Sequence, residues 1–178
     1  IRLAGGSDGG RARTRFRICS WNEGSTCIRR MRIQLDVRRT LDLEAVEHGK
    51  TLWTYRCFAR VRFQQSHGWS DERFAILDTG APFSVIPATV WESLAVTDLF
   101  PTELRGLIPK ATATLPAHLA TVPCVLTDEH GVSPTLTVVA LLTEAPDVPL
   151  ILGWSGLFDR AKLVLAGAHR RAHLEFTS

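Results

Sequence analysis

The sequence lacks any long apolar run. None of its hydrophobic stretches approaches the roughly 20 residues that a helix needs to cross a bilayer. The hydrophobic fraction of 45% and the charged fraction of 22% are close to the average of soluble globular domains. The length of 178 residues is too short for two full domains and suits one domain with an extension. We therefore expect a single soluble domain without a membrane partner.

Cysteine and histidine are not arranged as metal ligands. The cysteines form no C-x-x-C pair and have no histidine at zinc-ligand spacing. None of the histidines pairs with a nearby cysteine or serine in a pattern that suggests a nucleophile and its base. The sequence thus favours no metal site and predicts small thiols that are buried or partly buried. Without a leader sequence, we expect the cytoplasm as the compartment. The cysteines are Cys19, Cys27, Cys57 and Cys124.

Apolar residues are rare before Met31, the only methionine. Residues 1–30 are rich in glycine, serine and arginine, and ten of the eighteen arginines lie between Arg2 and Arg39. Because this composition cannot build a core, we expect residues 1–30 to be a disordered extension and residues 31–178 to be the folded domain. Nucleic-acid binding by these arginines is an alternative, but no recognised motif accompanies them, so no nucleic-acid partner is expected.

The pattern after residue 50 is typical of an all-β protein. Short apolar runs rich in β-branched and aromatic residues alternate with turn residues, and residues 31–37 alternate as a half-buried strand does. Short helices are expected at 88–94 and 155–160, and a hairpin loop at 128–131. No internal repeat is visible. The other expected strands are 52–63, 73–77, 84–86, 119–126, 135–142, 148–152, 163–165 and 172–176.

One motif carries an acid in a place where a carboxylate could do chemistry. Asp78, Thr79 and Gly80 follow an apolar strand that ends at residue 77 and precede a second apolar run. The acid is therefore expected at a buried strand end. An ordinary turn is the alternative, since aspartate and glycine are common in turns.

With its flanks, this motif resembles the active-site signature of the pepsin-retropepsin clan, in which an apolar pair precedes Asp-Thr/Ser-Gly-Ala/Ser. The clan's second signature has two apolar residues and a glycine, and Ile151, Leu152 and Gly153 match it in order and separation. The resemblance covers about 52–176. It implies that Gly153 lets two backbones approach where any Cβ would clash.

The resemblance implies a retropepsin-like closed barrel with one catalytic loop per protomer. Asp78 would be the catalytic carboxylate, and Thr79, Gly80 and Ala81 would support its loop. Since such a site needs two carboxylates, the resemblance implies a homodimer with one Asp78 from each copy. The implied activity is that of an aspartic endopeptidase, which hydrolyses a polypeptide substrate with an activated water and without metal or cofactor. The alternative is a catalytically silent module that binds peptides or dimerises.

Two positions differ from the retroviral members, and one further element is implied. An acid after the alanine and an arginine after the second glycine are replaced by Pro82 and Trp154. Both charges are absent together, so neither is left unpaired. The flap that closes over substrate is expected between the first helix and the strand at 119–126. The flap candidates are Arg105, Gly106 and Leu107.

A chain that begins at Met31 should fold and self-associate like the full sequence, because residues 1–30 hold too few apolar side chains to add to a core. The measurement compares the thermal unfolding transition and the mass in solution of the two chains. Loss of the cooperative transition in the shorter chain would show that a structural strand had been mistaken for an extension.

Overall fold

β-strands make up most of the secondary structure, as the sequence pattern predicted. The computed structural model describes residues 30–105 and 114–177. No helix in these two ranges is long and apolar enough to span a membrane. The helical segments are α1 (Leu43–Glu47), α2 (Ala88–Trp91) and the turns η1 (Trp154–Phe158) and η2 (Gly167–His169). The strands are β1 (Arg30–Leu41), β2 (Trp53–Gln65), β3 (Gly68–Trp69), β4 (Arg73–Leu77), β5 (Ser84–Pro87), β6 (Thr97–Arg105), β7 (Thr114–Thr127), β8 (Leu136–Thr143), β9 (Ile151–Leu152), β10 (Ala161–Ala166) and β11 (Arg171–Thr177).

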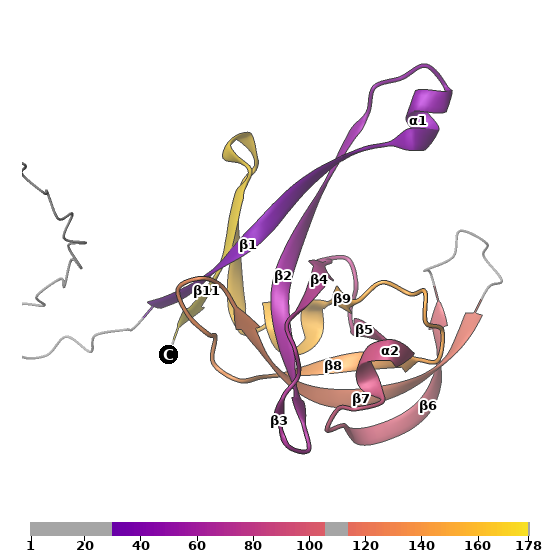
Figure 1. Cartoon of the computed structure of the whole chain (residues 1–178), viewed down its shortest axis with the longest axis vertical. Helices are drawn as coiled ribbons and strands as arrows, with labels where there is room; N and C mark the ends of the chain where they lie inside the picture. The colour runs from indigo at the N-terminus through magenta and orange to yellow at the C-terminus, as the bar shows by residue number, and fades with distance from the viewer. Residues whose placement is uncertain (1–29, 106–113, 178) are drawn as a thin grey trace, which may run out of the picture.

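A closed ring of strands forms the body of the protein (Figure 1). Around this ring, β2 pairs with β4, β4 with β9, β9 with β5, β5 with β8, and β8 with β7. An antiparallel pairing of β7 with β2 closes it, with Val61 opposite Leu126. The all-β fold class with short helices and a barrel-like ring is therefore confirmed.

Alternation along β2 explains why the ring encloses a core. Ala59, Val61 and Phe63 are fully buried, and the residues between them are partly exposed. Each large apolar side chain buried in this way contributes roughly 1.5–3 kcal/mol to folding. Other buried members of the same core are Ile33, Leu126, Val138, Leu142, Leu152 and Leu174.

A two-stranded arm rises from the ring (Figure 1). Beyond the part of β1 that pairs with β11, β1 pairs only with β2 in the described chain, from Asp36 opposite Phe58 to Leu41 opposite Trp53. Helix α1 lies at the tip, where the Asp42 carboxylate accepts a hydrogen bond from the Ala45 backbone N–H at 3.0 Å. We call residues 38–56 the arm.

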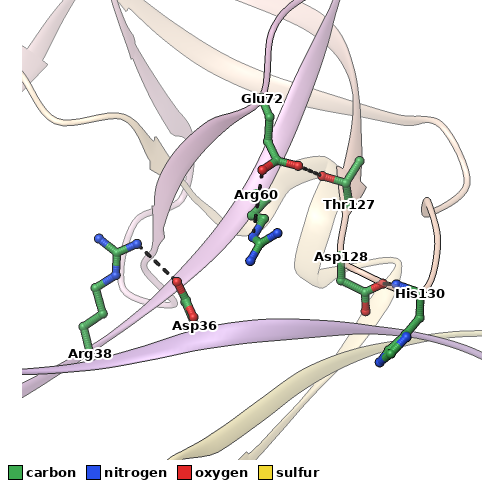
Figure 2. Close-up of polar contacts among 7 residues, drawn as sticks. All are labelled: Asp36, Arg38, Arg60, Glu72, Thr127, Asp128 and His130. Atoms are coloured by element: carbon green, nitrogen blue, oxygen red, sulfur yellow. Dashed lines mark hydrogen bonds and ion pairs between the residues drawn. The ribbon is translucent and has the colours of Figure 1, made fainter.

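Polar contacts join neighbouring segments of the sheet below the arm, and Figure 2 shows those of Glu72 and the contact of Asp128 with His130. The Asp128 carboxylate accepts hydrogen bonds from the backbone N–H groups of Gln34 (2.7 Å), His130 (2.7 Å) and Gly131 (2.8 Å). Burial raises the pKa of Asp128, but these three donors and the nearby His130 ring outweigh it, so the pKa lies below its ordinary value. The charged form of Asp128 therefore ties β1 to the loop after β7.

Glu72 links two strands of the ring. Its carboxylate accepts a hydrogen bond from the Thr127 hydroxyl at 2.7 Å and lies 3.9 Å from the Arg60 guanidinium. Figure 2 shows Glu72 between these two residues, which belong to β2 and β7. The ion pair is half-exposed and contributes little alone, so the hydroxyl bond is the more specific link.

The structure contains an internal repeat that the sequence did not reveal. The Ser70 hydroxyl accepts a hydrogen bond from the Phe63 N–H (3.0 Å), and the Ser133 hydroxyl accepts one from the Leu126 N–H (2.9 Å). In both cases the serine N–H donates back to the same residue's carbonyl oxygen at 2.8 Å. We call this arrangement the serine clip. The two clips are 63 positions apart, and at that offset the residue that corresponds to Asp78 is Leu141.

Several elements differ from the sequence-based expectations. The strand expected at 73–77 is present with the same ends, and those expected at 31–37, 52–63, 84–86, 119–126, 135–142, 163–165 and 172–176 are present with shifted ends. The strand expected at 148–152 is reduced to Ile151–Leu152, since Pro149 has no N–H to donate. The helix expected at 88–94 ends at Trp91. Strands β3 and β6 and helix α1 were not foreseen, and the extension expected at 1–30 lies outside the described residues apart from Arg30.

The helix expected at 155–160 is present only in part, as the broken helical segment η1 (Trp154–Phe158). Ser155 has extended backbone angles (φ −67°, ψ 120°), and Gly156 has a positive φ of 87°. A Cβ at Gly156 would collide with the Thr137 carbonyl oxygen. The segment is therefore a tight turn packed on β8, which only glycine permits at this position.

Replacing Asp128 by Asn should destabilise the fold by about 1 kcal/mol at neutral pH, because the amide has one acceptor oxygen where the carboxylate uses two. Partial exposure of the site to water keeps the expected loss small. Since folding lowers the pKa of Asp128 below its ordinary value of 3.8, its contribution is present above that pH and is lost as the pH falls through the folded-state pKa. Urea unfolding of both proteins from pH 7 to pH 3 should show the difference shrinking in acid. The exposed neighbour offers the control Glu129→Gln, and equal stability of Asp128→Asn and wild type at pH 7 would contradict the assignment.

Candidate active site

Asp78 is the first residue beyond β4, and β9 fixes its backbone. β4 and β9 run parallel, with Leu77 opposite Leu152. The Ile76 N–H donates to the Leu150 carbonyl oxygen at 2.9 Å, and the Asp78 N–H donates to the Leu152 carbonyl oxygen at 3.0 Å. The last three residues of β4 are buried or partly buried in the ring, and Asp78, which follows them, is exposed at the edge of the ring.

The loop itself orients the carboxylate. Oδ1 of Asp78 accepts a hydrogen bond from the Gly80 N–H at 2.9 Å, and the Asp78 carbonyl oxygen accepts one from the Ala81 N–H at 3.3 Å. The sequence predicted an acid at a buried strand end. The strand end is partly buried, but Asp78, Thr79 and Gly80 are exposed in the single chain. The loop therefore presents its carboxylate and its hydroxyl residue outward.

The two sequence signatures pack against each other at Gly153. This glycine is buried, and a Cβ added to it would collide with the backbone of Phe83 and Ala81. Its N–H donates to the hydroxyl of the fully buried Ser84 at 3.2 Å. Ser84 was not singled out from the sequence, although a lone hydroxyl between apolar residues of a short strand is a usable signal.

Backbone hydrogen bonds join the signatures at the positions where the retroviral charge pair is missing. The Trp154 N–H donates to the Ala81 carbonyl oxygen at 2.9 Å, and the Ser155 N–H donates to the Pro82 carbonyl oxygen at 3.0 Å. The Trp154 side chain is exposed, and its ring centroid lies 5.6 Å from that of Phe158. The loop after Asp78 is thus braced without an ion pair.

Asp78 borders two cavities within the described residues. The first, of about 300 Å³, opens toward β6 and is called the flap cavity. The second, of about 440 Å³, opens toward the arm and is called the arm cavity. The flap cavity is lined by Asp78, Gly80, Ala81, Val85, Leu104, Arg105, Leu141 and Ile151, among others. The arm cavity is lined by Asp78 and Thr79 together with Tyr55, Arg56, Cys57, Ile76, Leu163 and Leu165, among others.

β6 and β7 form a hairpin in the region where the flap was expected. The two strands are antiparallel, with Arg105 opposite Thr114. Leu104 is buried with Val85 and Ile151, and the exposed Arg105 lies 3.0 Å from Glu103. Arg105 therefore lies at the cavity that contains Asp78, whereas the other two flap candidates, Gly106 and Leu107, lie outside the described residues.

The described thiols are not poised as nucleophiles. Burial raises the pKa of the Cys124 thiol to about 12, and partial burial raises that of Cys57. Because the thiolate is the reactive form, neither is activated at neutral pH. Cys124 is buried and Cys57 is partly buried, which confirms the expectation of buried or partly buried thiols for these two. Cys19 and Cys27 lie outside the described residues. Within residues 30–105 and 114–177, no three His, Cys, Asp or Glu side chains gather as metal ligands.

Comparison with known proteins finds similarity of structure but not of sequence. No protein-family model and no curated protein sequence matches the chain. Among solved structures, the chain is similar to a retropepsin-like aspartic protease from Rickettsia conorii, with 10% sequence identity and a TM-score of 0.47. The match covers 90% of this chain and 99% of that one. At this identity the similarity concerns the course of the backbone alone.

Replacing Gly153 by Ala should destabilise the protein by roughly 1–3 kcal/mol, because the new methyl group meets backbone that cannot move aside. The matched control is Gly131→Ala, since a Cβ there meets nothing within 4 Å. Chemical denaturation of both variants measures the difference. Equal stability of the two would mean that the loop and β9 do not pack as closely as described.

Proposed function

We propose that this chain is one half of an aspartic endopeptidase, and that two copies bring their Asp78 side chains together to hydrolyse a polypeptide. The observation that carries the proposal is the placement of Asp78. Its carboxylate is oriented by the Gly80 N–H, its loop is braced by Gly153, and it stands exposed between two cavities. An ordinary surface turn would need none of this bracing.

The need for a second copy follows from the number of acids. At the repeat offset, Leu141 stands where a second carboxylate would be, so the repeat supplies no partner for Asp78 within the described chain. An isologous dimer would supply it, because a two-fold axis beside the loop brings the same residue from each copy to the same place. The outward exposure of Asp78 and Thr79 fits such an arrangement.

The chemistry of the pair is general acid–base catalysis. Two carboxylates a few ångströms apart hold one proton between them, since both cannot be ionised together. The ionised Asp78 takes a proton from a water whose oxygen bonds to the peptide carbonyl carbon, while the protonated Asp78 hydrogen-bonds to the carbonyl oxygen. The C–N bond of the resulting tetrahedral intermediate then breaks, and the leaving nitrogen takes a proton from the pair.

Substrate would lie along the flap cavity in extended form. Leu104, Leu141 and Ile151 give this cavity an apolar wall that suits an apolar side chain. β6 is the last strand of the sheet in the described part of the chain, so its outer backbone groups are available to a peptide strand. Together they favour an unfolded or extended polypeptide over a compact small molecule.

Replacing Asp78 by Asn should lower the rate of peptide cleavage by roughly 10²–10⁴-fold, because the pair loses its acid–base function. Folding and self-association should survive, since the amide keeps the size of the carboxylate. The assay is mass spectrometry of an unfolded protein substrate from acidic to neutral pH, with the exposed Asp71→Asn as matched control. Substrate binding without cleavage by either wild type or variant would instead favour a silent peptide-binding module.

Specific activity should rise with protein concentration until the dimer saturates, because the active species forms by mass action. Excess Asp78→Asn chain added to wild type should suppress activity, since most wild-type chains would then sit in dimers with a single carboxylate. Activity per chain that is independent of both concentration and added variant would contradict a shared site.

A further inference from the structure

The arm and the β10–β11 hairpin leave a gap over the catalytic loop. Figure 1 shows both hairpins rising from the ring on the same side. Tyr55 of the arm and Leu163 and Leu165 of β10 line the arm cavity together with Asp78 and Thr79. Any body that approaches Asp78 from this side therefore contacts both hairpins as well.

The arm exposes several large apolar side chains, and such exposure is typical of a surface that binds another molecule. Leu43 is 72% exposed and Tyr55 is 54% exposed, and on the facing hairpin Leu165 is 60% exposed. Val46, Leu52 and Trp53 of the arm are also exposed. Concentrated exposure of this kind marks a surface that another protein covers.

Arginines of β1 hold the aromatic residues of the arm in place. The Arg39 guanidinium lies 3.7 Å from the Trp53 ring centroid and 5.9 Å from that of Tyr55. Arg38 lies 4.5 Å from the Phe58 ring centroid and 4.6 Å from that of Phe74. Arg39 thus holds two aromatic rings within the arm, and Arg38 links the foot of the arm to β2 and β4.

The tips of the two hairpins carry opposite charge. Glu44 and Glu47 are exposed at the end of the arm, and Arg170 and Arg171 are exposed at the end of the β10–β11 hairpin. Within the described part of the chain, none of these four forms an ion pair. In an isologous dimer, a contact between the acidic tip of one copy and the basic tip of the other would occur twice, and both contacts would join opposite charges.

We propose that the arm clasps a second copy of this chain, with the α1 tip of one protomer seated on the β10–β11 tip of its partner. The identity of the occupant rests on the proposed function, because Asp78 has no second carboxylate unless another copy approaches through this gap. The exposed apolar residues of the arm are then covered, and the charged tips set the register in which the two loops meet.

Charge reversal tests this arrangement. The first variant is Glu44→Arg with Glu47→Arg, and the second is Arg170→Glu with Arg171→Glu. Each alone places like charges at both contacts, so its dissociation constant should rise by at least about tenfold at low salt. An equimolar mixture should associate like wild type, because each contact then joins opposite charges. The matched control, Glu92→Arg with Glu129→Arg, reverses two exposed acids elsewhere and should associate like wild type.

Sedimentation equilibrium measures the dissociation constant of the dimer without any assay of catalysis. The clasp proposal and the peptidase proposal can therefore fail independently. Loss of association in each variant and its return on mixing support the clasp even when no substrate is cleaved, and in that case only the peptidase proposal fails. Dimers of both variants as tight as wild type would overturn the clasp, whatever the activity. A wild-type chain that stays monomeric at all concentrations would also overturn it, and the arm would then belong to a different partner.

Discussion

The crossing of two backbones at Gly153 is the constraint on which the ring and the site both depend. No side chain fits between this residue and the carbonyl groups of Ala81 and Phe83. That closeness lets β9 lie between β4 and β5, parallel to one and antiparallel to the other. The strand that closes this part of the ring is thus the strand that holds the loop of Asp78. Fold and carboxylate orientation are two results of the same packing.

The sequence predicted β2, whose burial alternates, and missed β6, which is almost wholly exposed. β2 alternates through Ala59 and Val61, which gives a period of two. β6 has one buried residue, Leu104, and its start is broken by a bulge and by Asp98 in a left-handed conformation. A local pattern cannot predict such an edge strand, because its pairing with β7 alone creates it. The helix expected at 155–160 is interrupted at Gly156, which has a positive φ and packs closely against β8.

The candidate site was predictable to the extent that its chemistry lies in short motifs. Asp78 and Gly153 stand in motifs of three residues each, and the structure brings those motifs together. Ser84 was missed because its partner, the Gly153 N–H, lies 69 positions away in the sequence. The strand that contains Tyr55 was also predicted, yet its exposure was not, since exposure depends on whether a further strand covers the arm.

The paired serine clips bear on the order in which the chain folds. Each clip joins residues only seven positions apart, Phe63 to Ser70 and Leu126 to Ser133. Loop-closure entropy makes such short closures far less costly than the pairing of β2 with β7 across the ring. We therefore expect two local nuclei, one per repeat, that form early and independently. The long-range pairing that completes the barrel then becomes the slow step, as its sequence separation requires.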